Sequence, residues 1–346
     1  MDDSQGRSRR GRATIVDIAR EVGVSPATVS NALNGRRYVE AATGARIKEA
    51  AARLGYRPNF RAQHLRTGRA DTIALLSSMP FAIAAGPSRL GFLMEVAAVA
   101  AASALERGMA LVLVPPLEKA SIPVSKLSVD GAIVIEPAAG DPDIAWLRSA
   151  GLPVVAIGKQ PGAGADIPYV DLQSGGSAEI MIGHLREQSA RRIGLVIGLA
   201  ERNSYVETEA VYRKYAESCG VEPAILKLDE REGEEGAHRA IAGLLSERPE
   251  LDGLCVPVDA FAVGANDAAA ELGLRVPHDL RIVTRYDGLR ARQAQPPLTA
   301  LDLHLDKVAA LAVDLLLASI RGNMEETSAQ GPLPTLIPRA SSVLPG

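Results

Sequence analysis

Residues 14–34 read TIVDIAREVGVSPATVSNALN, a stretch that predicts two short helices joined by a tight turn. The first helix has one apolar face at helical spacing, formed by Ile15, Ile18, Ala19 and Val22. Gly23 is expected to end this helix, because glycine adopts the left-handed conformation at little cost. Ser25 is expected to cap a second helix, with Pro26 at its first position. This arrangement is that of a helix-turn-helix, whose second helix enters the major groove of DNA.

The second helix has an outer face suited to lying in a groove. Val29 and Leu33 are expected to point inward. The side chains left outside are small or carry amides, so the helix can approach base edges closely. They are Ala27, Thr28, Ser30, Asn31 and Asn34. The alternative is a pair of packed helices without DNA contacts, which the sequence beyond the motif makes less favourable.

The composition is that of an ordinary α/β protein. The chain has 346 residues, enough for two or three domains, and 47% of them are apolar. It has no run of 18 apolar residues, and the N-terminal MDDSQGRSRRGR lacks the apolar segment of a secretory signal. Cys219 and Cys255 have no ligand-like spacing, so we expect reduced thiols and a cytoplasmic protein.

Charge is distributed unevenly along the chain. Residues 1–70 contain 14 Lys and Arg against 6 Asp and Glu, a net charge of +8, whereas the remainder carries −11. A basic head on an acidic body favours binding of a polyanion by the head. Residues 1–12 are expected to form a disordered basic tail, and its arginines have the alternative explanation of simple solvation.

Residues 40–55 predict a third helix that closes the head. Pro58 prevents this helix from continuing. The following segment, residues 59–70, contains FRAQHLR, a helix too short to be stable alone in water. We therefore expect a linker that becomes ordered only when something supports it.

From residue 72 onward, short apolar runs alternate with longer amphipathic stretches. The runs are TIALLSS, MALVLVPP, DGAIVIEP, LPVVAIGK, RRIGLVIG, LDGLCVPV and DLRIVTRY. The amphipathic stretches cover residues 90–107, 174–187, 205–219, 236–247, 260–272 and 304–321. This alternation predicts parallel sheets covered by helices and divided between two lobes. A cleft between the lobes is the expected small-molecule site.

These residues resemble the LacI–GalR family of bacterial transcriptional regulators over nearly the whole chain. The head motif continues into ARLGYRPN, and AQHL at 62–65 is similar to the family's hinge helix. VDGAIVI, HLREQSARRIGLVIG, AELGLRVPHDL and PPLTALDLHLDKVAALAVDLLLASIRG follow the family's core in order. The resemblance implies a DNA-binding domain at 13–58, a hinge at 59–70, and a two-lobed, dimeric, periplasmic-binding-protein-like core at 71–346.

The resemblance also implies roles for residues of the head. Thr14 and Ser25 match positions that contact phosphates, and a helix N-terminus favours anions by itself. Pro26, Ala27 and Asn31 match the principal base-reading positions. Asn31 can pair bidentately with adenine, whereas the other two would read shape or a thymine methyl group.

Further DNA contacts are implied in the linker and the turns. Leu65 matches a leucine that wedges into the minor groove and kinks the duplex, the alternative being an ordinary buried leucine. The expected phosphate contacts are Arg36, Arg37, Arg57 and Arg66. The head departs from the family where Val39 is followed by Glu40 instead of a serine cap, so Thr43 is the candidate cap of the third helix.

In the core, the positions implied to bind an effector are only partly preserved. Phe92 and Leu93 match an aromatic pair that lines the cleft of relatives. The family's polar contacts correspond to Lys159, Thr208, Asp259 and either Tyr286 or Asp287. Because a cleft recognises sugar hydroxyls with Asp, Asn and Arg side chains, we expect an effector other than a typical neutral sugar. Lys159 indicates an anionic group or is simply a solvated lysine.

The sequence contains no pattern for catalysis. The five histidines lack metal-ligand spacing, and no nucleophile or phosphate-binding motif is present, so we expect no metal, no cofactor and no enzymatic activity. The predicted function is a sequence-specific transcriptional regulator, a repressor that binds a pseudo-palindromic operator as a homodimer and responds to a small molecule. The alternative is a solute-binding protein of a transport system, which shares the core but requires export.

Overall fold

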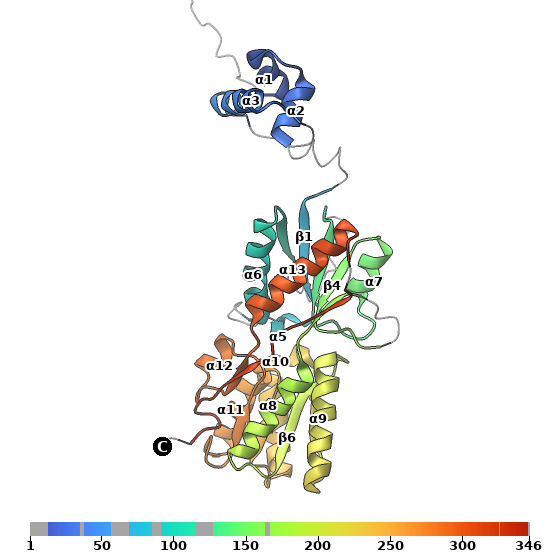
Figure 1. Cartoon of the computed structure of the whole chain (residues 1–346). Helices are drawn as coiled ribbons and strands as arrows, with labels where there is room; N and C mark the ends of the chain where they lie inside the picture. Colours follow the sequence, from blue (N-terminus) through green and yellow to red (C-terminus); the bar gives the residue numbers. More distant parts are fainter. Residues whose placement is uncertain are drawn as a thin grey trace, which may run out of the picture. The chain divides into compact units, whose positions relative to one another are not determined.

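The computed structural model describes residues 13–34, 38–56, 69–84, 91–114, 127–162, 167–324 and 326–344. It divides into two compact units, residues 1–68 and 69–346 (Figure 1). We call the described part of the first unit the head and that of the second unit the core. Among the described residues, no helix combines the length and apolarity needed to cross a bilayer.

The head consists of three helices, α1 (Ile15–Val22), α2 (Pro26–Asn34) and α3 (Ala41–Arg53). Gly23 follows α1 with φ of 75°, the left-handed conformation that ends a helix. The Oγ of Ser25 accepts a 3.0 Å hydrogen bond from the backbone N–H of Thr28 and so caps α2. The helices pack around a small core whose fully buried side chains are Ile18, Val29, Ile47 and Ala50. The predicted helix-turn-helix is confirmed.

The start of the third helix differs from our expectation. α3 begins at Ala41, directly after Glu40, and Glu40 makes no side-chain capping hydrogen bond. The prediction that Thr43 caps this helix is therefore wrong, because Thr43 already lies in its first turn. The helix is instead held by its neighbours: Arg46 donates a 2.8 Å hydrogen bond to the carbonyl of Val22 at the end of α1.

The first lobe of the core is built on a parallel six-stranded sheet in the order β11-β5-β4-β3-β1-β2. Its strands are β1 (Thr72–Ser77), β2 (Ala110–Val114), β3 (Gly131–Ile135), β4 (Val154–Ile157), β5 (Tyr169–Asp171) and β11 (Ser328–Gln330). Its helices are α5 (Phe81–Ala84), α6 (Phe92–Glu106), α7 (Pro142–Ser149) and α13 (Leu305–Arg321). Alternate residues of β1 face opposite sides of the sheet, with Ile73 in the cluster that contains α6 and α13, and Ala74 in the cluster that contains α7.

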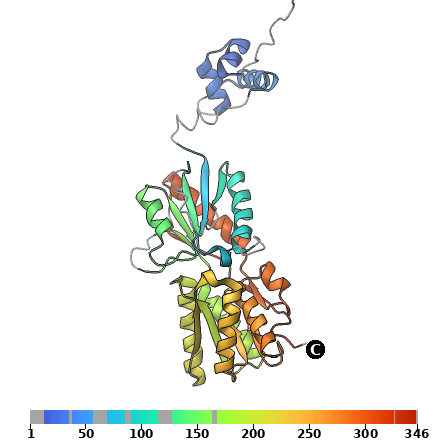
Figure 2. The same ribbon diagram turned by 180° about the vertical axis from the view of Figure 1, so that it is seen from behind.

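The second lobe has a parallel four-stranded sheet in the order β7-β6-β8-β9 (Figure 1, Figure 2). Its strands are β6 (Ile193–Gly198), β7 (Ala224–Leu228), β8 (Gly253–Cys255) and β9 (Arg281–Val283). Its helices are α8 (Ser174–Glu187), α9 (Asn203–Cys219), α10 (Gly233–Glu247), α11 (Asp259–Glu271) and α12 (Leu289–Gln293), with the short turn η2 (Glu230–Glu232). Gly264 lets α11 approach α10, since a Cβ there would lie 2.6 Å from the carbonyl oxygen of Glu234. The predicted two-lobed α/β core with parallel sheets is confirmed.

The chain passes between the lobes after β5, after β10 (Ala300–Asp302) and after β11. β10 pairs in antiparallel fashion with β12 (Thr335–Ile337), and the residues after β12 return to the second lobe. There, the Oγ of Ser341 accepts a 2.8 Å hydrogen bond from the N–H of Thr299 and donates to the carbonyl of Ile282. Ser342 lies 2.7 Å from Nε2 of the buried His184 on α8.

Stability of the core is expected to depend on His184. Burial lowers the pKa of His184 below the ordinary 6.5, so just below pH 6.5 the unfolded chain binds a proton that the folded chain does not. The free energy of unfolding should therefore be highest above pH 6.5 and fall as the pH decreases through it. His184→Gln, whose amide can still bond to Ser342, should flatten this dependence in urea unfolding measured from about pH 7.5 to about pH 5.

The exposed His278 provides the matched control for this measurement. His278→Gln should leave the slope of the unfolding free energy against pH as it is in the original protein. If the slope of the His184→Gln protein equals that of the original protein, this histidine does not carry the predicted pH dependence.

Candidate functional site

The first candidate site is the exposed N-terminal end of α2 in the head. Thr14, Ser25, Pro26 and Ala27 are exposed, and Thr28, Ser30 and Asn31 are half-buried. The first free backbone N–H groups and the positive end of the helix dipole gather at Ser25, which is the usual environment for a phosphate. The structure thus brings most of the predicted DNA-contacting residues onto one helix and the turn before it.

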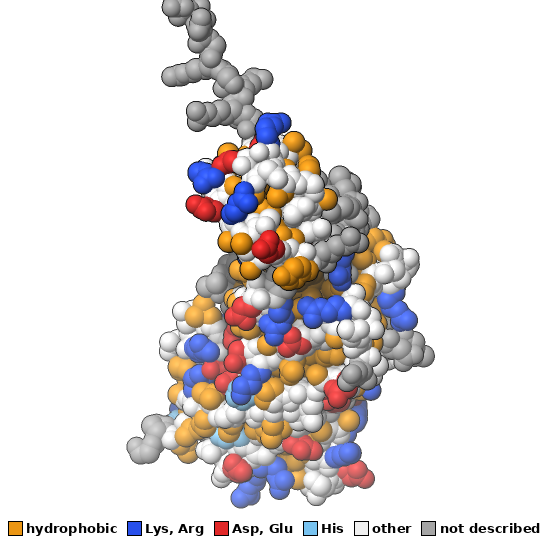
Figure 3. Space-filling view, turned by 45° about the horizontal axis from the view of Figure 1, so that its top comes forward, with side chains coloured by type: hydrophobic (Ala, Val, Ile, Leu, Met, Phe, Trp, Pro, Cys, Tyr) orange, Lys and Arg blue, Asp and Glu red, His pale blue; other side chains and the backbone are white. Residues whose placement is uncertain are grey.

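Several predicted DNA contacts lie outside the described residues. They are the side chain of Asn34 and the residues Arg36, Arg37, Arg57, Leu65 and Arg66. The described head holds equal numbers of basic and acidic residues, four of each, so the positive excess resides in the segments not described. In agreement, Figure 3 shows blue and red side chains lying close together on the visible face rather than in a large patch of one charge.

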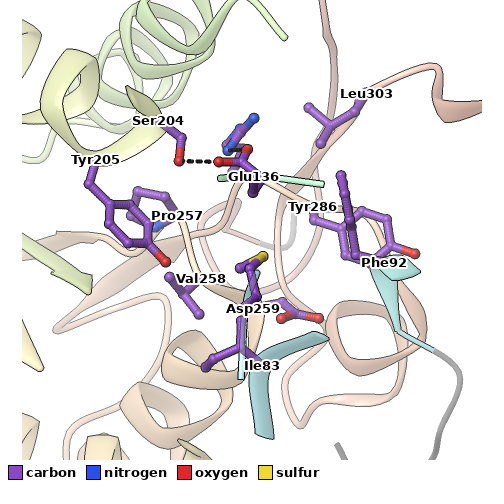
Figure 4. Close-up of a pocket in the computed structure, with 12 residues that line it drawn as sticks. Ile83, Phe92, Glu136, Ser204, Tyr205, Pro257, Val258, Asp259, Tyr286 and Leu303 are labelled. Carbon is purple, nitrogen blue, oxygen red and sulfur yellow. Dashed lines mark hydrogen bonds and ion pairs between the residues drawn. The ribbon is translucent and has the colours of Figure 1, made fainter. Parts of the chain in front are cut away.

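The second candidate site is a cavity between the two lobes of the core. In the first sheet β2 lies outside β1 and β4 lies outside β3, so the order of the strands reverses at the β1–β3 pair; β6 and β8 form the equivalent pair in the second sheet. The carboxyl ends of such strand pairs are the usual ligand sites of open α/β sheets. The cavity is lined by Met79, Ile83, Phe92, Glu136, Ser204, Tyr205, Pro257, Val258, Asp259, Arg285, Tyr286 and Leu303 (Figure 4).

The free space in this cavity is small, about 40 Å³. That volume holds roughly three water molecules and is too small for a sugar. The two lobes are therefore closed on one another, and their own side chains fill the space between the sheets. Admission of a ligand larger than a few atoms requires the lobes to move apart.

The central group of the cavity is the carboxylate of Glu136, which follows β3 in the first lobe. It binds the second lobe at both oxygens: Oε1 accepts a 2.9 Å bond from Nη1 of Arg285, and Oε2 accepts a 2.7 Å bond from Oγ of Ser204. The carbonyl oxygen of Glu136 also accepts a hydrogen bond from Nη1 of Arg202. Glu136 is 4% exposed and has φ of 48°, a left-handed conformation that costs about 1 kcal/mol or more for a residue other than glycine.

Arg202 forms the second connection between the lobes. Its Nε and Nη2 bind the two carboxylate oxygens of Glu230 at 2.8 and 2.9 Å, and Nη2 also donates to the carbonyl of Ser78 in the first lobe. Burial alone would lower the pKa of Arg202, but the Glu230 carboxylate more than offsets this effect and the pKa is raised. Tyr205 donates a 2.8 Å hydrogen bond to the same carboxylate, and its burial raises the pKa of the phenol well above 10.

A third connection lies at the N-terminal end of α11. Arg290 donates to the carbonyls of Ala82 and Ile83 in the first lobe, at 2.6 and 2.9 Å, and binds Glu234 at 2.7 Å. Its Nη1 is 3.4 Å from the carboxylate of Asp259, which faces the cavity. Burial raises the pKa of Asp259, and the nearby guanidinium only partly opposes this shift.

Three of the predicted effector-contacting residues meet at the cavity, namely Phe92, Asp259 and Tyr286. The rings of Phe92 and Tyr286 meet edge to face with centroids 5.2 Å apart, and the Tyr286 hydroxyl donates to Glu95 of α6. This contact between a first-lobe helix and a second-lobe loop extends the closed interface.

The other four predicted residues do not line this cavity. Leu93 is buried in the core of the first lobe, and Lys159 is exposed. Thr208 is buried and donates a 2.7 Å hydrogen bond to the carbonyl of Ser204 one turn earlier in α9. Asp287 lines a neighbouring cavity and accepts a 2.6 Å bond from Arg339.

Sequence reasoning missed four buried charged residues at the interface between the lobes, of which Glu136 and Arg285 line the cavity and Arg202 and Glu230 pair beside it. A usable signal existed for two of them. Glu136 and Arg285 follow the apolar runs DGAIVI and LRIV almost directly, which places them at carboxyl ends of parallel strands. No local sequence pattern distinguishes the buried Arg202 from the exposed arginines of the chain. Among the described residues, no group of His, Cys, Asp and Glu side chains has the geometry of a metal site.

Comparison with known proteins finds matches for both parts of the chain. Residues 14–59 match the family model of bacterial regulatory proteins of the lacI family, and residues 182–342 match that of a periplasmic binding protein-like domain. The HTH-type transcriptional regulator CelR of Thermobifida fusca is 29% identical over 92% of this chain and 95% of its own length. The HTH-type transcriptional repressor PurR of Erwinia tasmaniensis is 29% identical over 95% and 96%.

Solved structures show the same architecture. A complex of the transcriptional regulator CelR with cellobiose superimposes with a TM-score of 0.70 and 26% identity, covering 95% of this chain and 100% of that one. The lac repressor dimer bound to operator gives a TM-score of 0.76 at 22% identity, covering 96% and 100%, which establishes a shared fold. From its N-terminal domain, its core and its full-length relatives, the chain belongs to the lacI family of bacterial regulatory proteins.

Proposed function

We propose that this protein is a DNA-binding transcriptional repressor that binds a pseudo-palindromic operator as a homodimer and is controlled by a small molecule bound between the lobes of its core. The observation that carries the proposal is the capped helix-turn-helix at residues 14–34, which presents the N-terminal end of α2 to solvent in a lacI-family domain. Two such heads can read the two halves of a symmetric site.

In this proposal the chain has four segments: a basic tail at 1–12, the DNA-binding domain at 13–58, a hinge at 59–70 and the core at 71–346. Thr14 and Ser25 contact phosphates, and Pro26, Ala27 and Asn31 read bases. Leu65 enters the minor groove. The remaining DNA contacts come from Thr28, Ser30, Asn34, Arg36, Arg57 and Arg66. A location in the cytoplasm, where the DNA is, is part of the same proposal.

Control by a ligand follows from the closed core. A molecule that binds between the lobes changes their separation, and the change alters the hinge and the affinity of the heads for DNA. Such coupling typically amounts to about 1–3 kcal/mol. The CelR–cellobiose complex is a relative of the same architecture with a small molecule bound, which supports binding of a small molecule by this chain.

Two other functions are less favoured. A solute-binding protein of a transport system has a comparable core, but the lacI-family domain at 14–59 has no role in it. An enzyme on the same fold is disfavoured by relatives named as transcriptional regulators.

The proposal is tested by selecting bound duplexes from fragmented genomic DNA with the full-length protein. We expect a dyad-symmetric motif, with affinity that falls on the order of 10³-fold between about 50 and 200 mM salt for 6–10 phosphate contacts. Recovery of fragments without a common dyad motif would contradict sequence-specific repression.

Asn31→Ala is expected to remove a base-specific contact made by α2. Operator affinity should fall by about 1–3 kcal/mol, and preference should relax at one symmetric base pair in each half-site. Fluorescence anisotropy with single-base operator variants measures both effects. Asn323→Ala, at an exposed position of the core, is the control and should bind all the duplexes like the original protein. An equal loss on every duplex would instead make Asn31 a phosphate contact.

Leu65→Ala is expected to weaken operator binding by about tenfold or more, because the shorter side chain cannot hold the unstacked base step open. The melting temperature of the core and the dimerisation constant should stay the same. Leu333→Ala, which truncates an exposed leucine of the core, is the matched control. Undiminished operator affinity of the Leu65→Ala protein would show that the hinge assignment is wrong.

A further inference from the structure

Arg285 has hydrogen-bond donors that the protein does not use. It lies two residues after β9, is 7% exposed and lines the cavity between the lobes. Its Nη1 binds Glu136, but its Nε and Nη2 are buried and have no hydrogen-bond partner within the described residues. More than about 90% of buried polar groups in proteins are hydrogen-bonded, so two unpaired donors on one buried guanidinium require an explanation.

The two unpaired donors form one edge of the guanidinium group. The Nε–H and Nη2–H bonds of an arginine are nearly parallel, and their spacing matches the two oxygens of a carboxylate or phosphate. Arg202 uses this same edge in the same interface, holding both oxygens of Glu230 at 2.8 and 2.9 Å. In Arg202 the Nε–Nη2 edge binds the carboxylate of Glu230, whereas in Arg285 the same edge has no hydrogen-bond partner within the described residues.

Nearby acidic groups cannot fill this edge in the closed core. The carboxylate of Glu136 is already held by Arg285 Nη1 and by the hydroxyl of Ser204. Asp259 lies across the cavity from Glu136 and Ser204, beside Ile83 (Figure 4), and has Arg290 as its own partner.

We propose that the effector of this protein carries a carboxylate or phosphate group that binds bidentately to the Nε–Nη2 edge of Arg285. This inference rests on the proposed function. Because the free space is only about 40 Å³, the group enters as the lobes separate and is then enclosed between them. The remainder of the effector meets the edge-to-face pair of Phe92 and Tyr286 and the oxygens of Asp259.

The test uses the smallest probes that carry the proposed group. The melting temperature of the full-length protein is measured in acetate, inorganic phosphate, acetamide and chloride, with ionic strength kept constant. We expect acetate or phosphate at about ten times its dissociation constant to raise the melting temperature by roughly 2–4 °C over chloride, and acetamide to have no such effect. A response to acetate alone identifies a carboxylate, and a response to phosphate alone identifies a phosphate.

Arg285→Lys keeps the charge and a donor for Glu136 but lacks the two-donor edge, so the anion-dependent shift should be lost. Arg285→Gln combined with Glu136→Gln removes both buried charges together and should behave in the same way. The matched control is Arg275→Lys at an exposed pair with Asp279, which should respond like the original protein. Equal shifts in the original and Arg285→Lys proteins, no shift with either anion, or an equal shift with acetamide would overturn the inference.

Operator binding by the Arg285→Lys protein separates this inference from the proposed function. If the original and Arg285→Lys proteins both bind a dyad-symmetric duplex but neither anion raises the melting temperature of the original protein, the anionic effector is refuted and the repressor assignment stays intact. Loss of preference for dyad-symmetric duplexes in the original protein would instead refute the assignment itself.

Discussion

The connection between the lobes that makes the most bonds at one residue centres on a buried glutamate at the end of β3. Glu136 uses both carboxylate oxygens and its carbonyl oxygen to bind three residues of the other lobe, Arg285, Ser204 and Arg202. Its left-handed backbone conformation is unfavourable in itself, and the bonds across the interface compensate for it. A buried charge that loses its partners is strongly destabilising, so these bonds form or break together with the closure of the lobes.

In the proposed function, this arrangement gives a ligand a way to control the head. The cavity lies at the point of each sheet where the strand order reverses, and it is already occupied by paired charges of the protein. An effector must compete with these pairs or complete them. In either case its binding changes the balance between closed and open cores, and a ligand can shift such a balance only by its differential affinity for the two states. The three passages of the chain between the lobes allow this movement without unfolding either sheet.

How far the sequence predicts the structure depends on how local the determining interactions are. The head could be predicted almost completely, because Gly23 and Ser25 act on neighbouring residues. The buried strands of the core were recognisable as apolar runs, whereas the short strands β5 and β10, each ending in an aspartate, do not lie in such a run. The third helix begins without the expected cap because a contact from Arg46 to α1 holds it in place.

The cavity could be predicted only in part. Phe92, Asp259 and Tyr286 were identified through the family resemblance, and they do meet there. The Glu136 bonds join residues that are 66, 68 and 149 positions apart in the chain, and no periodicity or spacing rule connects such residues. For Lys159 the sequence left two alternatives, contact with an anionic group or simple solvation. The residue is exposed and does not line the cavity, and the unpaired donors belong to Arg285.

The most direct test of this account is the distance between the lobes in solution. One spin label is attached to the exposed Cys219 of α9 and another to Ala145→Cys on α7, in labelled protein diluted with unlabelled protein, while Cys255 is buried and should not react. The account predicts one narrow distance distribution without effector, and a longer and broader one after Glu136→Ala. An unchanged narrow distribution in the Glu136→Ala protein would contradict the claim that this residue holds the lobes closed.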